Sequence, residues 1–400
     1  MTLVFSWILF ILVQSVTYNA AQLCDTKDRF NNTWFGSDCQ YKCHCKNNVA
    51  CNVTNGDCPN ACDIGWFGPA CQYADLANTA KLILSDGASK DITNITDGDD
   101  TTCTDLTVSS FWLRITWNFN IYFTWLRLVV SIAESQSERF SIKFPDNVPT
   151  QNSECINVFI DKITMDIYCN ISKPLNEIFL NGSAVSTICS LYISKGRNVA
   201  LKQPTNQTSN FYDSYYLSSA AVDGNGYSIF SDGSCTHTAE GDPAPTWILY
   251  FKSVVTVTSY TIYNRVQPLL SYNREADLFR LKGFILRTFD QTNNIVQNYT
   301  DTETSVLEVY NILSTDPWAQ VSKVQMTATD TTNLLILTLC EVEIFGDSVC
   351  QIDKFKYGHD CENVCNCAVP GEKCFVSTGN CPSGCKAGFY GQGCNKSMNF

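Results

Sequence analysis

The chain has few of the residues on which hydrolytic active sites depend. It contains only three histidines in 400 residues, and none has a motif partner typical of a catalytic triad. A G-x-S-x-G nucleophile elbow is absent. The acidic cluster at 97–100 falls in turn-like sequence, whereas paired catalytic carboxylates need a defined separation across a cleft. We therefore expect no enzymatic activity.

Positive charge and long apolar runs are also scarce. The 27 Lys and Arg residues against 39 Asp and Glu give a net charge of -12, which would repel phosphate backbones and anionic membrane surfaces. Only residues 1–21 contain a long apolar run, which is typical of a cleaved signal peptide and too short to span a bilayer. The sequence predicts an extracellular protein with no membrane span, either secreted or the ectodomain of a longer membrane protein, and excludes nucleic acid as a partner.

Cysteine, by contrast, is abundant. The 22 cysteines are an even number, and such a density is typical of disulfides in an oxidising compartment. N-x-Ser/Thr sequons agree with this location. There are eight of them, at Asn31, Asn52, Asn94, Asn170, Asn181, Asn206, Asn298 and Asn395.

Two segments of eight cysteines each repeat one another, at 22–72 and 348–396. Five of their seven cysteine spacings agree, which indicates duplication. Modules of about fifty residues bury too little surface to fold without cross-links. The C-x3-C-x-C pattern and the later Gly65-Trp66-Phe67-Gly68 and Gly388-Phe389-Tyr390-Gly391 resemble laminin-type or multiple-repeat EGF-like modules. Zinc binding by Cys43-His44-Cys45 is the alternative to disulfides, and a spacer role is the alternative to ligand binding.

The region between these modules is rich in short β-branched and aromatic runs separated by Asn, Asp, Gly and Ser. This pattern is typical of sandwiches or barrels. Two halves of similar layout follow one another, at 73–195 and 196–347. We therefore predict an all-β chain: two β-sandwich domains flanked by two small disulfide-rich modules.

The second half carries a further resemblance. Its motifs, in order, are Asn198-Val199-Ala200, Ala221-Val222-Asp223-Gly224-Asn225, Gly233-Ser234-Cys235-Thr236-His237-Thr238, Asn264-Arg265 and Leu339-Cys340-Glu341-Val342-Glu343-Ile344. Over 198–346 this half resembles the fucolectin family, the eel-fucolectin and tachylectin-type branch of the discoidin-like jelly rolls. The resemblance implies a galactose-binding-like jelly roll, and the first half resembles the same fold loosely, as a degenerate copy.

The resemblance also implies disulfides and a structural calcium ion. The family pairs the cysteine after Gly-Ser with the one in the Leu-Cys-Glu-Val strand, which implies Cys235 with Cys340 and, by parallel, Cys103 with Cys189. Cys155 and Cys169 then remain as the third pair. The implied calcium ligands are Ala220, Asp223, Asn225, Ser234, Cys235 and Glu341, which offer the oxygens that calcium prefers.

Residue types alone favour the alternative, in which Asp-Gly-Asn is an Asx-type turn without an ion and Glu341 is a solvated strand residue. In the first half the corresponding residues are Asp97, Asp99, Thr102 and Ser190, and the loss of the last carboxylate argues against calcium there.

A sugar site is implied at His237 and Arg265, which fall at the family's fucose-contacting positions. Arginine offers a rigid fork of donors and neutral histidine either role. A lone histidine is also common as a satisfied structural residue. The family's adjacent cysteines are absent after Arg265, and we take Arg274 as the second arginine, displaced by an insertion. The first half has Asp105 and Ser131 at the aligned places, so we expect that domain to be structural.

These observations predict a calcium-dependent, non-catalytic, fucose-type lectin that binds fucosylated or related glycans. The alternative is an extracellular adhesion or receptor fragment whose sandwiches contact other proteins and whose sugar binding is lost.

Overall fold

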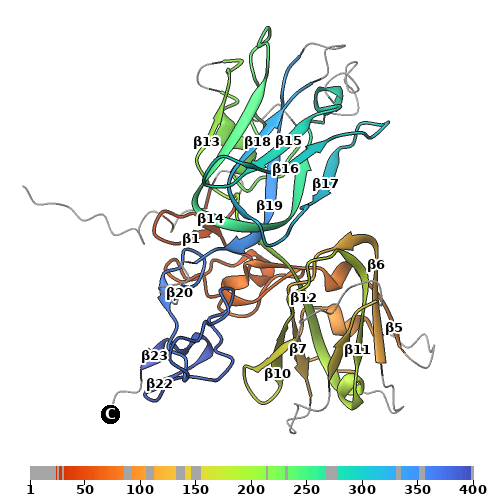
Figure 1. Ribbon diagram of the computed structural model, residues 1–400, viewed down its shortest axis with the longest axis vertical. Helices are drawn as coiled ribbons and strands as arrows, with labels where there is room; N and C mark the ends of the chain where they lie inside the picture. The colour runs from red at the N-terminus through yellow and green to blue at the C-terminus, as the bar shows by residue number, and fades with distance from the viewer. Residues whose placement is uncertain are drawn as a thin grey trace, which may run out of the picture.

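The computed structural model describes residues 24, 27–28, 31–84, 92–104, 112–131, 140–145, 155–212, 215–229, 233–266, 278–329, 335–350 and 356–397. The chain is all-β, with two β-sandwiches and two small disulfide-rich modules (Figure 1). The expected signal peptide at 1–21 lies outside the described residues. Short 3-10 helices connect the strands: η2 (Lys46–Asn48), η3 (Pro69–Cys71), η4 (Ala77–Thr79), η5 (Thr93–Thr96), η7 (Ser183–Thr187), η8 (Ser218–Val222), η10 (Phe279–Leu281) and η12 (Gln392–Cys394).

The first sandwich packs two antiparallel sheets face to face. One sheet has the order β5-β6-β11-β8, formed by β5 (Lys81–Leu84), β6 (Trp112–Ile121), β11 (Leu175–Asn181) and β8 (Ser141–Lys143). The other has the order β9-β10-β7-β12, formed by β9 (Ile156–Phe159), β10 (Thr164–Tyr168), β7 (Trp125–Val130) and β12 (Ile188–Asn198). Alternate residues of β6, namely Leu113, Ile115 and Trp117, are buried in the core because side chains along a strand point to opposite faces.

The second sandwich is built around the long strand β14 (Thr246–Tyr263). The first part of β14 pairs with β13 (Thr205–Gln207), and its last part pairs with β17 (Val309–Leu313) and β19 (Glu341–Ser348). Strand β18 (Gln320–Thr327) pairs with both parts and continues to β15 (Ile285–Phe289) and β16 (Ile295–Thr300). Trp247, Tyr260 and Phe284 are fully buried in this separate core.

Strand β12 connects the two sandwiches without a loop. Its first residues pair with β7, and its last two, Arg197 and Asn198, pair with β19. The expected boundary at Lys195 therefore lies inside a strand. Gly196 has a φ of 103°, and a Cβ there would lie 2.6 Å from the backbone nitrogen of Gly346. A side chain would push the strands apart, so glycine is required where the sandwiches meet.

All 22 cysteines form disulfides. The sandwich pairs are Cys235–Cys340, Cys103–Cys189 and Cys155–Cys169, the same pairs that the resemblance to fucolectins implies. Both small modules join cysteines first to second, third to fifth, fourth to sixth and seventh to eighth: Cys24–Cys39, Cys43–Cys51, Cys45–Cys58 and Cys62–Cys71, then Cys350–Cys361, Cys365–Cys374, Cys367–Cys381 and Cys385–Cys394.

The N-terminal module, drawn in red and orange in Figure 1, lies among the other three parts. It contains β1 (Trp34–Phe35), β2 (Tyr41–Lys42) and β3 (Trp66–Phe67), and β3 pairs with β4 (Tyr73–Asp75), which also pairs with β12. This module contacts the second sandwich through Lys42 Nζ, which donates to the carbonyl of Gly224 at 3.0 Å.

The C-terminal module packs against the first sandwich. It contains β20 (Lys356–Tyr357), β21 (Asn363–Val364), β22 (Phe389–Tyr390) and β23 (Lys396–Ser397). The rings of Phe375 and Tyr168 stack with centroids 3.7 Å apart, and the hydroxyls of Tyr168 and Thr378 lie 2.6 Å apart. Within the described residues, no helix has the length and apolar character needed to cross a bilayer.

Candidate functional site

His237 lies in an extended segment that pairs with residues 337–339. Thr236 and Thr238 each form two hydrogen bonds with this segment, one through the backbone and one through the hydroxyl. Because neighbouring side chains of an extended segment point to opposite sides, the imidazole of His237 faces the other way. There it packs beside Phe211, with ring centroids 4.5 Å apart.

The hydrogen bonds of His237 determine its tautomer. Nδ1 lies 2.7 Å from the carbonyl oxygen of Thr238, which can only accept, so Nδ1 carries the proton. Nε2 lies 3.0 Å from Nη1 of Arg280, which can only donate, so Nε2 is an acceptor. The imidazole is therefore neutral in this arrangement.

Arg280 is the partner that the sequence interpretation missed. It lies in η10 and is half-buried, directly before the fully buried Leu281. The expected second arginine, Arg274, falls in 267–277, outside the described residues. The sequence offers one weak signal for Arg280, because it directly precedes Leu281, a core residue, and the turn at Gly283.

Arg265 follows the end of β14, and its neighbour Asn264 organises this region. The side-chain amide of Asn264 donates to the carbonyls of Leu278 and Leu307, both at 3.0 Å. Its Oδ1 accepts from the backbone nitrogen of Arg265 at 2.8 Å. Asn264 is fully buried, so it ties the backbone at Arg265 to the segment that leads into Arg280.

The two side chains expected to contact sugar are buried, whereas two tyrosines of the neighbouring ring cluster are exposed. His237 is 3% exposed and Arg265 is 6% exposed. Tyr212 and Tyr215 are 58% and 64% exposed, and through Phe211 and Tyr216 they belong to the same cluster of rings as His237. The structure thus joins a buried histidine and its arginine partner to a cluster of rings with exposed members. We call His237, Arg280 and the two exposed tyrosines, together with Arg265 as the arginine expected from the sequence, the His237 site.

The expected calcium ligands gather beside this site. Asp223 directly follows η8, and its Oδ1 accepts from the backbone nitrogen of Asn225 at 3.0 Å, so the Asx turn is formed. Glu341 begins β19 and is 1% exposed. Its Oε1 accepts from the backbone nitrogen of Gly224 at 3.2 Å, which brings the turn and the strand together. The remaining expected ligands, Ala220, Ser234 and Cys235, are all buried. Ala220 lies in η8, and Cys235 is joined to Cys340, directly before Glu341.

The electrostatics of Glu341 test whether a cation fits here. Burial, followed by the negative charges of Asp223 and Glu343, holds the pKa of Glu341 well above its usual range. Its Oε2 is buried and has no hydrogen-bond partner among the described residues. A buried carboxyl group next to a second carboxylate either keeps its proton or needs a positive ion beside it, and the oxygen without a partner is open to such an ion. The donor set, all oxygen, suits calcium.

The N-terminal module covers this turn. A Cβ on Gly224, whose φ is 83°, would lie 3.0 Å from the ring of Trp34. The ammonium of Lys202 lies 4.4 Å from the centroid of the same ring. Together with the bond from Lys42 to the Gly224 carbonyl, these contacts hold the turn against the N-terminal module.

In the first sandwich, three of the four corresponding residues, Asp97, Asp99 and Thr102, hydrogen-bond one another. Asp97 accepts through Oδ1 from the backbone nitrogen of Asp99 at 2.8 Å and through Oδ2 from the hydroxyl of Thr102 at 2.7 Å. Ser190, which replaces Glu341, is fully buried. Asp105 lies outside the described residues, and Ser131 is exposed after β7.

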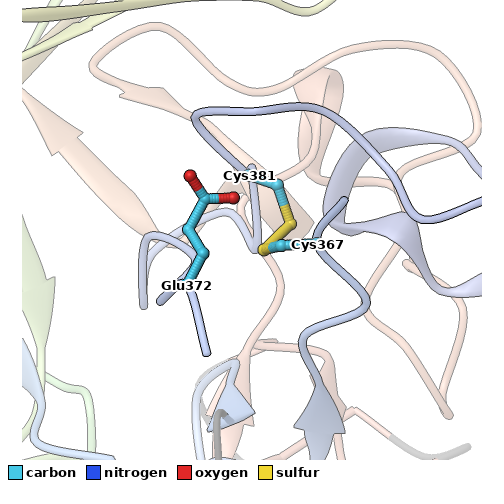
Figure 2. A group of neighbouring side chains, drawn as sticks. All are labelled: Cys367, Glu372 and Cys381. Atoms are coloured by element: carbon cyan, nitrogen blue, oxygen red, sulfur yellow. A yellow bond between two sulfur atoms is a disulfide. The ribbon is translucent and has the colours of Figure 1, made fainter. Parts of the chain in front are cut away.

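A cluster in the C-terminal module has the residue types of a metal site but not the chemistry. Cys367, Glu372 and Cys381 lie together (Figure 2), and the two sulfurs form a disulfide. The carboxylate of Glu372 accepts from the hydroxyl and the backbone nitrogen of Ser383. In the N-terminal module, Cys43 and Cys45 are likewise disulfide-bonded, so no thiolate of these motifs is available to zinc.

No protein-family model matches the sequence, and no curated protein matches it. Among solved structures, the chain is similar to a Streptococcus pneumoniae fucose binding module, with 26% identity over 38% of this chain and 96% of that chain and a TM-score of 0.32. It is also similar to the lectin domain of lectinolysin complexed with Lewis B antigen, with 21% identity over 37% and 96% and a TM-score of 0.32.

A fucolectin from the serum of striped bass, Morone saxatilis, covers more of the chain. It is 18% identical over 70% of this chain and 99% of that chain, with a TM-score of 0.32. TM-scores at this level are too low to assign the chain to a family.

Proposed function

We propose that the protein is an extracellular, non-catalytic carbohydrate-binding protein whose second sandwich binds fucose-like sugars at the His237 site with the help of a structural calcium ion. The observation that carries the proposal is the neutral His237, held between the Thr238 carbonyl and Arg280 in a cluster of rings that includes exposed tyrosines. Sugars present hydroxyl groups that donate and accept together, and such a mixture of recessed polar groups and aromatic faces suits them.

Each part of the site has a distinct task in this proposal. Arg280 and Arg265 supply only donors, and they recognise the lone pairs of sugar hydroxyls. The orientation of His237 is fixed by the Thr238 carbonyl, so its Nε2 stays available as an acceptor toward a hydroxyl when Arg280 turns to the ligand. Tyr212 and Tyr215 offer flat apolar faces for the ring of the sugar.

Calcium would be held by Asp223, Asn225, Ser234, Glu341 and the carbonyls of Ala220 and Cys235. When bound, it supplies positive charge that keeps Glu341 ionised. The chain's own contribution is to connect the Asp223 turn to β19. Cys235 is two residues before His237 and is joined to Cys340, so this bracing reaches the sugar site directly.

A glycan array and a fucose affinity column test the proposal. The wild-type protein should be retained on fucose and eluted by free fucose or by a calcium chelator. Arg280→Ala should weaken binding at least about tenfold, equivalent to about 1.4 kcal/mol, because the site loses its half-buried donor. Arg287→Ala is the matched control, since Arg287 bonds Asn298 on a different strand. A folded wild-type sample that binds no glycan would contradict the proposal.

The low exposure of His237 and Arg265 favours a second candidate, an adhesion fragment whose sandwiches contact other proteins and whose sugar binding is lost. This candidate predicts that a double variant, His237→Ala with Arg265→Ala, binds extracellular protein partners as the wild type does. Loss of partner binding in this folded double variant would contradict it.

A further inference from the structure

A cavity lies where three parts of the molecule meet. It has a volume of about 730 Å³ and is lined by the first sandwich, the second sandwich and the C-terminal module. Thr124 and Trp125 come from the first, Trp318 from the second and Phe375 from the third. This volume falls within the range of about 300–1,000 Å³ that is usual for bound small molecules.

The walls of the cavity expose apolar surface. Trp318 is 41% exposed and Ile156 is 40% exposed, and both line the cavity. Lys356 and Lys373, which carry donors, also line it. Aromatic and apolar side chains facing an open space beside donors are typical of a site that another group covers.

One wall residue is a glycosylation acceptor. Asn170 lines the cavity, is exposed, and begins the sequon Asn170-Ile171-Ser172. The backbone around it is fixed: Cys169 is joined to Cys155, its nitrogen donates to the carbonyl of Thr124 at 3.1 Å, and Ile171 is 1% exposed. Asn170 therefore stays at the cavity wall and cannot move away with a mobile loop.

We propose that Asn170 carries an N-linked glycan whose first sugar residues occupy this cavity and bind the two sandwiches to the C-terminal module. The aromatic face of Trp318 packs against a sugar ring, and the lysine ammonium groups donate to sugar hydroxyls. A covalently attached ligand has a high effective concentration at its own cavity, so it excludes free ligands of similar size.

The other sequons differ from Asn170. Asn298 is exposed on β16 of the second sandwich and does not line the cavity. Asn181 has the atom that would carry a glycan, Nδ2, buried in the folded chain. The position of Asn170 is therefore distinctive: its side chain is accessible and it lies next to a cavity between modules.

The first test is site-specific glycan release. The protein, secreted from eukaryotic cells, is treated with a peptide N-glycosidase in its native state and after denaturation, and occupancy at Asn170 and Asn298 is measured by mass spectrometry. Native release should be at least about tenfold slower at Asn170, and the two sites should become equal after denaturation. An unoccupied Asn170, or equal native release at both sites, would overturn the proposal.

Variants distinguish protection of the Asn170 glycan by the cavity from a general effect of the substitution on folding. Trp318→Ala should leave occupancy of Asn170 unchanged and make its native release several-fold faster. Ser172→Ala and Thr300→Ala are a matched pair, since each removes the exposed residue that completes one sequon and keeps the asparagine. The first should lower the melting temperature by several degrees and the second should not. Unchanged release in Trp318→Ala together with equal melting temperatures of the pair would overturn the proposal.

Discussion

The second sandwich has a buried glutamate, Glu341, directly after Cys340, where the first has Ser190 directly after Cys189. The surroundings are otherwise parallel. The long-range disulfides have Cα–Cα distances of 3.8 Å and 3.7 Å, and each sandwich has an Asx turn at an Asp-Gly sequence. The two sandwiches therefore share the disulfide and the turn, and they differ in whether a carboxyl group is buried beside the turn.

At a second pair of positions the ionisable residue lies in the first sandwich and its neutral counterpart lies in the second. In the first sandwich, Asp75 Oδ1 accepts from the backbone nitrogens of Ala77 and Ile193, both at 2.8 Å. In the second, Asn198 Oδ1 accepts from the nitrogens of Ala200 and Ile344, both at 3.1 Å. The hydrogen bonds correspond, but only Asp75 can ionise.

Exchanging Asp75 and Asn198 should give the largest change in the free energy of unfolding and in its pH dependence. Burial raises the pKa of Asp75 to about 7, although the two backbone hydrogen bonds act against the rise. A raised acid pKa means that the folded state holds the proton more tightly than the unfolded state. The contribution of protonated Asp75 to stability is complete below its ordinary pKa of 3.8, and it is lost as the pH rises toward the pKa of about 7 in the folded state.

Asp75→Asn should remove this loss, on the order of 4 kcal/mol at about 1.4 kcal/mol per pKa unit, and Asn198→Asp should transfer it to the second sandwich. Calorimetry from pH 4 to pH 8, with the transitions of the two sandwiches followed separately, measures both effects. A wild-type first sandwich whose stability does not fall across this range would contradict the prediction.

The next largest effect concerns calcium. Glu341→Ser makes the second sandwich like the first, and it should abolish stabilisation by calcium. In the wild type, calcium at one hundred times its dissociation constant should add about 2.7 kcal/mol to the free energy of unfolding. Ser190→Ala is the control and should leave the calcium response unchanged. If isothermal titration finds the same calcium affinity in Glu341→Ser and the wild type, Glu341 is not a ligand.

The smallest expected effect is the difference in stability cost between alanine substitutions in the two Asp-Gly turns. Gly98 and Gly224 both have positive φ angles, of 73° and 83°, and both turns face the N-terminal module. A Cβ on Gly98 would lie 3.6 Å from Ile64, which is ordinary contact, whereas one on Gly224 would lie 3.0 Å from Trp34. Gly98→Ala should therefore cost about 1–2 kcal/mol for its backbone conformation alone, and Gly224→Ala should cost more.

Gly224→Ala should also weaken calcium binding several-fold, because its backbone nitrogen bonds Glu341. Chemical unfolding and calcium titration of the two variants measure the difference. Equal costs in both turns would show that Trp34 does not hold the second turn in place.

Much of the frame was predictable from local sequence. The alternation of buried residues along β6 follows from the two-residue period of strands, and the two eight-cysteine repeats follow from spacing. The resemblance to fucolectins, and not local pattern, implied the pair Cys235 and Cys340, which the structure joins.

The role of Arg280 was not predicted from the sequence. Spacing after Arg265 led to Arg274, which lies outside the described residues and stays a prediction. The contact between Arg280 and His237 joins segments that are 43 residues apart, and local spacing carries no information on such a pair.

The sequence by itself determined the strands, the cross-linked modules, the glycosylation acceptors and the residue types available for a calcium ion. Tertiary structure alone decided that Arg280 meets His237, that the N-terminal module packs against Gly224, and that Asn170 borders a cavity made by three modules. The physical reason is that periodicity and spacing act within short segments. Contacts between distant segments depend instead on how complete sandwiches and modules pack, for example where Gly196 allows β12 to approach β19.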